Sequence, residues 1–98
     1  MKPYTIDPRA VDDLAEAMEW YREHGDDLDL RLHTDVRGTI DKVCEHPEHG
    51  QRYQRTRYLF RRTAIFPYLV IYEDRPQDVF VIAIAHERRN PRYWRRRT

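Results

Sequence analysis

The segment from Tyr68 to His86 constrains the fold most, because it holds two runs of β-branched and aromatic residues on either side of a turn. The runs are Tyr68–Glu73 and Val79–His86, and the loop that begins with Asp74-Arg75-Pro76-Gln77 has a length that suits an antiparallel hairpin. Apolar residues occupy both faces of each run, as expected of central strands in a covered sheet. The sequence therefore predicts a hairpin at the centre of a sheet.

The apolar pattern of the second strand stops at a run of charged and titratable residues, His86-Glu87-Arg88-Arg89. A strand of this composition is normally a core element, so the charges lie where the core meets solvent. Basic and aromatic side chains follow directly, and others precede the hairpin. The candidate binding residues are Arg61, Arg62, Arg88, Arg89, Arg92, Tyr93 and Trp94.

Two amphipathic segments precede the strands. After a short strand signal at 4–6, Asp7 and Pro8 are typical of an N-cap and of the first helical position. Spacings of three and four residues predict the buried face of this helix: Val11, Leu14, Ala15, Met18 and Tyr21. Gly25 ends it, and Asp26 or Asp27 can cap a second helix that runs to Pro47. The buried face of the second helix is predicted to comprise Leu28, Leu32, Val36, Ile40 and Val43.

The predicted order is strand, helix, helix and then three or four strands, because residues 52–66 are typical of one or two extended segments. This β-α-α-β-β-β(β) order indicates an α+β fold in which an N-terminal helical hairpin packs on a mostly antiparallel sheet. A chain of 98 residues fits one domain, which we expect to span 1–98.

Charge is divided unevenly along the chain. The net charge is only +1, but residues 1–50 carry 6 Lys/Arg against 13 Asp/Glu, whereas residues 51–98 carry 12 Arg against 4 Asp/Glu. The basic half contains no lysine. The planar guanidinium suits phosphate and carboxylate groups, so this half is expected to recognise anions. A genome rich in G+C, which enriches Arg codons, is the alternative explanation.

No apolar run approaches the roughly 20 residues that cross a bilayer, and the N-terminal segment lacks the apolar stretch of a secretory signal. We therefore expect a cytoplasmic protein without a membrane contact. Cys44, His46 and His49 are metal-ligand residue types, but structural zinc sites usually draw ligand pairs from separate segments. We expect neither a metal nor another cofactor.

The chain also resembles a known family over essentially its full length, and the specific residues of the resemblance are concentrated between Pro47 and Trp94. The Phe66-Pro67-Tyr68 start, the Tyr72 that closes the first strand and the His86-x-Arg88-Arg89-Asn90-Pro91-x-x-Trp94 exit are similar to the signature of the RelE/ParE superfamily of bacterial toxins. The ParE-like branch, often labelled plasmid stabilisation proteins, is the more similar one. The resemblance implies the toxin of a type II toxin–antitoxin pair.

Two mechanisms exist within that superfamily. RelE-like members cut messenger RNA in the ribosomal A site, whereas ParE-like members inhibit DNA gyrase without a known hydrolytic role. RNA cleavage needs a base, cations that stabilise the charged phosphorane and an acid. For that alternative the candidate catalytic residues are Arg61, His86, Arg88 and Tyr93.

The residues favour the non-catalytic mechanism. The resemblance places Trp94 where RelE-like ribonucleases carry a catalytic tyrosine, and an indole cannot transfer a proton. His86 ends a buried strand, so a structural role is favoured over a catalytic one. We expect a gyrase inhibitor, with the ribosome-dependent endoribonuclease and a non-toxic interaction module of the same fold as alternatives.

The resemblance also implies a partner, because such toxins are held inactive by an antitoxin whose acidic and apolar C-terminal segment wraps over the toxin. The basic half would meet the acidic side chains, and the sheet face and helix edge would take the apolar ones. A nucleic-acid platform and a plainly solvated basic tail are the alternatives. Operator DNA is expected to be contacted only through the antitoxin.

Overall fold

The computed structural model describes residues 1–97, and the predicted α+β order is confirmed. The elements are β1 (Tyr4–Ile6), α1 (Pro8–Arg22), α2 (Leu28–Glu45), the 3-10 helix η1 (Pro47–His49), β2 (Gln51–Arg52), β3 (Leu59–Arg62), β4 (Tyr68–Asp74), β5 (Val79–His86) and α3 (Arg92–Arg95). The stretch expected to hold one or two extended segments, residues 52–66, contains β3 and the last residue of β2. Within residues 1–97, no helix has the length and apolar character needed to cross a membrane.

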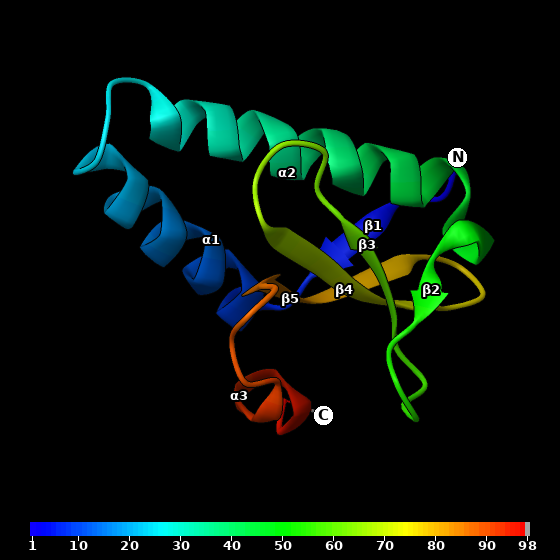
Figure 1. The fold of residues 1–98 in the computed structure, drawn as a ribbon. Helices are drawn as coiled ribbons and strands as arrows, with labels where there is room; N and C mark the ends of the chain where they lie inside the picture. The colour runs from blue at the N-terminus through cyan, green and yellow to red at the C-terminus, as the bar shows by residue number, and fades with distance from the viewer. Residues whose placement is uncertain (98) are drawn as a thin grey trace.

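The strands form one sheet in the order β1-β5-β4-β3-β2, with the predicted hairpin at its centre (Figure 1). β1 runs parallel to β5, whereas the other neighbouring pairs are antiparallel. The prediction of a mostly antiparallel sheet is confirmed. The connection between the parallel strands β1 and β5 is long, because it includes the helical hairpin and the strands β2, β3 and β4.

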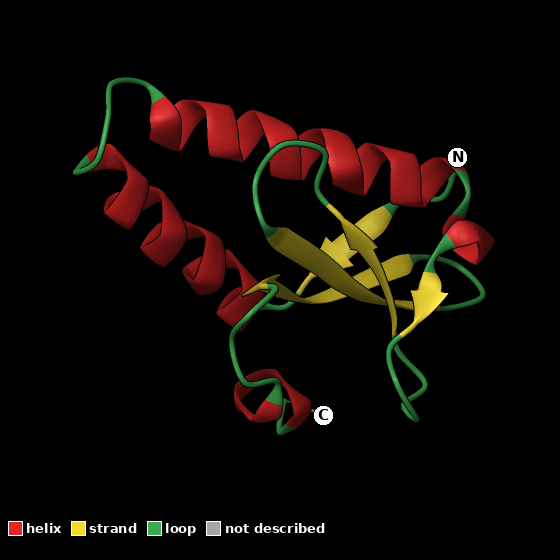
Figure 2. Cartoon of the chain, viewed as in Figure 1, coloured by secondary structure: helices red, strands yellow, loops and turns green. Residues whose placement is uncertain are grey.

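Helices cover the two faces of the sheet differently, as Figure 2 shows. The α1–α2 hairpin packs on one face, where Val70, Tyr72 and Val81 join the apolar side chains of both helices. The short α3 covers the opposite face, where Trp94 packs with Ile71 and Ile82. Residues of β4 and β5 are therefore buried on both faces, which accounts for their continuous apolar pattern.

The start of α1 follows the sequence prediction. The Asp7 carboxylate accepts a hydrogen bond from the Arg9 backbone N–H at 2.8 Å, and Pro8 occupies the first helical position.

The buried face of α1 is confirmed in part. Three of the predicted residues are partly buried and pack against the core: Leu14, Met18 and Tyr21. Val11 is 48% exposed, and Ala15 is exposed as well. The buried positions of the helix are Ala10, Asp13 and Ala17, and Asp13 pairs with Arg97 of the C-terminal segment.

The buried face of α2 is confirmed at Leu32, Val36, Ile40 and Val43, and the helix ends before Pro47 as predicted. Its start differs from the prediction. Asp27 occupies the N-cap position with a φ of 61°, and its side chain caps no backbone N–H. The tight α1–α2 connection imposes this left-handed conformation, which turns the carboxylate away from the helix end.

Candidate binding surface at the exit of β5

The chain leaves β5 through a tight turn that exposes three arginines. The backbone N–H of Arg89 donates to the His86 carbonyl at 3.0 Å, and that of Arg88 donates to His86 Nδ1 at 3.1 Å. The Glu87 N–H donates to the Pro67 carbonyl at 3.0 Å, which ties the turn to the start of β4. The turn therefore has a defined backbone conformation although its side chains are solvated.

Arg88, Arg89 and Arg92 together form what we term the basic exit surface. All three are exposed, and none forms an ion pair with any residue of 1–97. The Arg89 guanidinium lies 3.6 Å from the ring centroid of Tyr93, which holds it in place by a cation–π contact. Because no carboxylate pairs with these three guanidinium groups, positive charge is concentrated on this surface.

Trp94 does not belong to this surface, which corrects the sequence prediction. Its side chain is 1% exposed and packs edge-to-face against Tyr53 and Tyr58, with ring centroids 4.9 and 5.8 Å away. The four-residue α3 thus closes the sheet face that the helical hairpin leaves open. Trp94 is a packing residue, and the indole has no access to a partner in this conformation.

Tyr93 is half-buried, and its hydroxyl is inaccessible to solvent. Within residues 1–97 this hydroxyl has no hydrogen-bond partner. Burial raises the pKa of Tyr93 to about 12, so the phenol stays protonated at neutral pH. A buried phenol with a raised pKa is poorly suited to act as a base.

Arg97 attaches the C-terminal segment to the rest of the protein. Its guanidinium donates to both carboxylate oxygens of Asp13, at 2.7 and 2.8 Å, and to the Ile82 carbonyl at 3.1 Å. Arg9 donates to the Arg97 carbonyl at 2.6 Å. This bidentate pair connects the last described turn to α1 and orients the basic exit surface beside it.

Arg61 and Arg62 lie elsewhere, on β3. Arg62 forms an ion pair with Glu87 at 3.1 Å and is therefore partly neutralised. The half-buried Arg61 has no ion pair within residues 1–97. Both side chains line a cleft with His49, apart from the basic exit surface.

The four candidate catalytic residues of the ribonuclease alternative do not lie together in the structure. Arg61 lies in the cleft beside β3, whereas His86 and Tyr93 line a different cleft against α1. The bond from the Arg88 N–H occupies the Nδ1 lone pair, so a neutral His86 carries its proton on Nε2. In that tautomer Nδ1 is engaged by the backbone of the exit turn, which favours a structural role for His86.

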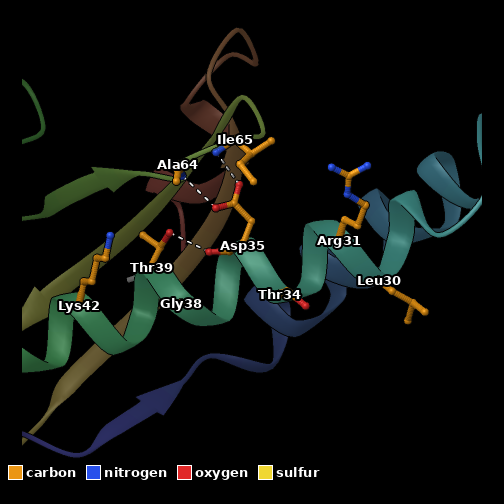
Figure 3. Close-up of a pocket in the computed structure, with 9 residues that line it drawn as sticks. All are labelled: Leu30, Arg31, Thr34, Asp35, Gly38, Thr39, Lys42, Ala64 and Ile65. Carbon is orange, nitrogen blue, oxygen red and sulfur yellow. Dashed lines mark hydrogen bonds between the residues drawn. The ribbon is translucent and has the colours of Figure 1, made fainter.

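A second surface lies along α2, beneath the loop that joins β3 to β4. The Asp35 carboxylate accepts hydrogen bonds from three consecutive backbone N–H groups, those of Ala64, Ile65 and Phe66, at 2.8–2.9 Å. Figure 3 shows the bonds from Ala64 and Ile65. Sequence reasoning missed this clamp. The sign of it in the sequence was an acidic residue, Asp35, beside Val36 in the apolar stripe of the second helix.

The clamp holds the loop over an apolar groove along α2. Leu30 and Ile65 are 58% and 68% exposed, and Gly38, which also lines the groove, has no atom of residues 1–97 beyond its own turn of helix within 4 Å of the position a side chain would take. Arg31 and Lys42 also line the groove, and neither forms an ion pair within residues 1–97. Apolar side chains flanked by free cations suit a segment that is both apolar and acidic.

The Cys-x-His-x-x-His motif does not form one site. Cys44 is buried in the core, where burial raises the pKa of its thiol, whereas His46 and His49 are exposed. The two imidazoles flank Glu48, which the sequence motif did not include.

Comparisons with known proteins agree with the fold. A family model described as "ParE toxin of type II toxin-antitoxin system, parDE" matches residues 4–91. No curated protein matches the chain. Among solved structures, one described as "Chromosomal ParDE TA system from P. aeruginosa" superposes with a TM-score of 0.78 at 12% identity, covering 88% of this chain and 96% of that one. At this identity the structural likeness concerns the fold.

Proposed function

Because the chain belongs to the ParE toxin family of type II toxin–antitoxin systems, we propose that it inhibits DNA gyrase and is neutralised by a cognate antitoxin. The observation that carries the proposal is the basic exit surface, where Arg88, Arg89 and Arg92 are exposed without an acidic partner in residues 1–97. Guanidinium groups on a structured turn bind phosphate or carboxylate groups, which a gyrase–DNA complex offers.

The position of these arginines supports recognition rather than hydrolysis. His86 supports the turn through Nδ1, and the Tyr93 phenol is buried beneath Arg89. Both residues therefore maintain the shape of the surface. A toxin of this kind acts by occupying its target, so its potency depends on affinity and on charge.

We assign antitoxin binding to the groove along α2. Leu30 and Ile65 offer apolar contacts, while Arg31 and Lys42 offer charges to an acidic segment. An extended or helical peptide with alternating apolar and acidic residues matches this pattern. Antitoxin and target then use separate surfaces, and a variant in one leaves the other intact.

The target is tested by expressing the chain from a tightly controlled promoter. Gyrase inhibition predicts DNA breaks, altered plasmid supercoiling and intact transcripts. Codon-phased cleavage in 5′-end maps of translated messages would refute the gyrase proposal in favour of the endoribonuclease. Normal growth with neither effect, at equal protein levels, would leave only the interaction module.

The surface is tested with the double variant Arg88→Ala/Arg89→Ala, which should lose toxicity while keeping the parent's thermal unfolding midpoint. The matched control is Arg22→Ala/Arg37→Ala, which removes the same charge from exposed positions on α1 and α2. Undiminished toxicity of the first variant, or equal loss in the control, contradicts the assignment of the surface.

The antitoxin site is tested by co-expression with the cognate antitoxin. Ile65→Glu places an acid in the groove and should weaken co-purification of the antitoxin at least tenfold while toxicity persists. Val11→Glu, at another exposed apolar position, is the control. Full neutralisation of the Ile65 variant would exclude the groove as the antitoxin site.

A further inference from the structure

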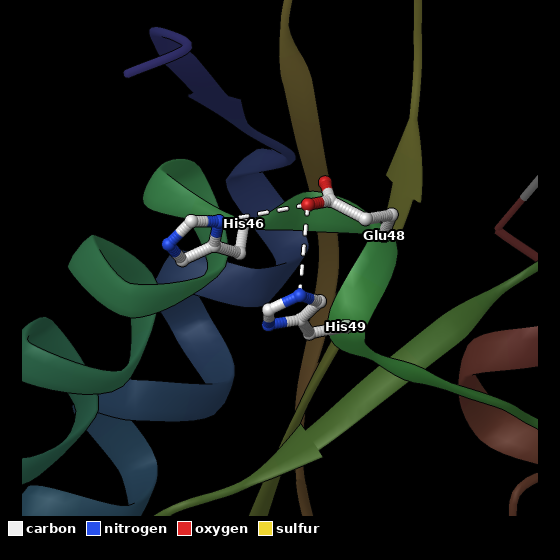
Figure 4. Close-up of side chains that lie close together, drawn as sticks. All are labelled: His46, Glu48 and His49. Atoms are coloured by element: carbon white, nitrogen blue, oxygen red, sulfur yellow. Dashed lines mark ion pairs between the residues drawn. The ribbon is translucent and has the colours of Figure 1, made fainter.

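We propose that His46, Glu48 and His49 bind one divalent transition-metal ion of the zinc type, at the turn between α2 and β2. Two imidazole nitrogens and one carboxylate oxygen converge there (Figure 4). This inference is independent of the proposed function, because it rests on ligand geometry alone.

The backbone of the turn is fixed before any ion arrives. The His46 N–H donates to the Lys42 carbonyl at 3.1 Å, and the His49 N–H donates to the His46 carbonyl at 3.0 Å. The Tyr72 hydroxyl, which is buried, donates to the Pro47 carbonyl at 2.6 Å. Only side-chain rotation is needed to complete the site, so little backbone entropy is lost on binding.

The ligand atoms already stand close to the separations that a metal requires. Glu48 Oε1 lies 3.5 Å from His46 Nδ1 and 3.7 Å from His49 Nε2. A tetrahedral ion with bonds of 2.0–2.1 Å places its ligand atoms about 3.4 Å apart. The three ligand atoms lie within 4.8 Å of one another, and the two rings are stacked with centroids 4.7 Å apart. The rings are nearly parallel, so both exposed side chains must rotate before their nitrogen lone pairs meet at one ion.

The donor set selects the class of ion. Imidazole favours zinc, copper, nickel and cobalt over magnesium and calcium, which prefer oxygen ligands throughout. Cys44 is 3% exposed within the hydrophobic core and supplies no ligand. Protein side chains therefore occupy three positions, and the remaining position is left to water or to a group from a partner.

The test is isothermal titration of the full chain with Zn²⁺ alone. We expect one ion per chain, and a thermal unfolding midpoint that rises by about 5 °C or more when free Zn²⁺ is ten times Kd. His46→Gln and His49→Gln should each weaken binding at least tenfold, and Glu48→Gln should weaken it measurably. Proton NMR should show the imidazole signals of His46 and His49 shifting together and saturating at one equivalent.

His33→Gln is the matched control, because His33 is an exposed histidine on α2 outside the site. It should bind Zn²⁺ as the parent does, and so should Cys44→Ser. Equal weakening in the His33 control, stoichiometry above one with no saturation, or loss of binding only in the Cys44 variant overturns the proposal.

Discussion

The ion pair between Asp13 and Arg97 should dominate the attachment of the C-terminal segment. Its side chains are only 6% and 9% exposed, so neither charge is solvated. Asp13 also accepts a hydrogen bond from the Ile84 N–H at 3.1 Å, and the carboxylate therefore serves three donors. Removing its charge leaves a guanidinium buried without a counterion.

Breaking a buried pair by removing one partner costs about 3–5 kcal/mol. Asp13→Asn keeps an oxygen for the Ile84 N–H, so we expect the lower end, about 3 kcal/mol of unfolding free energy. For a domain of this size that loss lowers Tm by about 12–24 °C. Removing the guanidinium as well, as in Asp13→Asn/Arg97→Met, should restore stability to within about 1 kcal/mol of the parent, because the amide oxygen still accepts from the Ile84 N–H.

Urea denaturation followed by circular dichroism measures these differences, provided that the m-value is unchanged. The control is Asp41→Asn, because the Asp41–Arg37 pair spans 3.8 Å and both side chains are more than half exposed. That variant should be indistinguishable from the parent. A loss below about 0.5 kcal/mol for Asp13→Asn would refute the reasoning, since it would mean that the guanidinium finds solvent when the carboxylate is gone.

Three other predictions follow from the packing and the caps. The Arg9 guanidinium holds the pKa of Asp7 below its ordinary 3.8, so its stabilisation is present above pH 3.8 and disappears as the pH falls through the folded value; the difference in unfolding free energy between parent and Asp7→Asn should shrink from pH 7 to pH 2. A Cβ at Gly50 would collide with the Tyr72 hydroxyl, so Gly50→Ala should lose about 1–3 kcal/mol, and the double variant with Tyr72→Phe should recover part of it in urea titrations. Trp94→Ala should cost about 3–5 kcal/mol by the same assay, whereas a loss under 1 kcal/mol would contradict its burial.

The two helices show what local sequence can and cannot predict. On α2 the spacing of Leu32, Val36, Ile40 and Val43 matches the helical period, and the structure confirms the buried face. On α1 the same reasoning is confirmed at Leu14, Met18 and Tyr21 and wrong at Val11 and Ala15. It also misses the buried Asp13, whose partner lies 84 residues away. A periodic pattern carries no information about so distant a partner.

The candidate surface shows the same limit. The exposure of Arg88 and Arg89 was predictable, because charge follows a strand at its end. The burial of Trp94 was not, because a four-residue helix is too short to show a period and the rings that surround the indole come from residues 53 and 58. The Asp35 clamp depends on the geometry of a loop, which the sequence of α2 does not encode.

The pairing of β1 with β5 has a consequence for synthesis. β1 can pair only after β5 has been synthesised, because Tyr4 pairs with Val79. A chain that stops before β5 therefore cannot complete that edge of the sheet. Contacts between such distant residues also slow folding. A ribosome that is still translating β4 therefore holds a chain without the basic exit surface, and a product truncated there should be harmless to the cell that makes it.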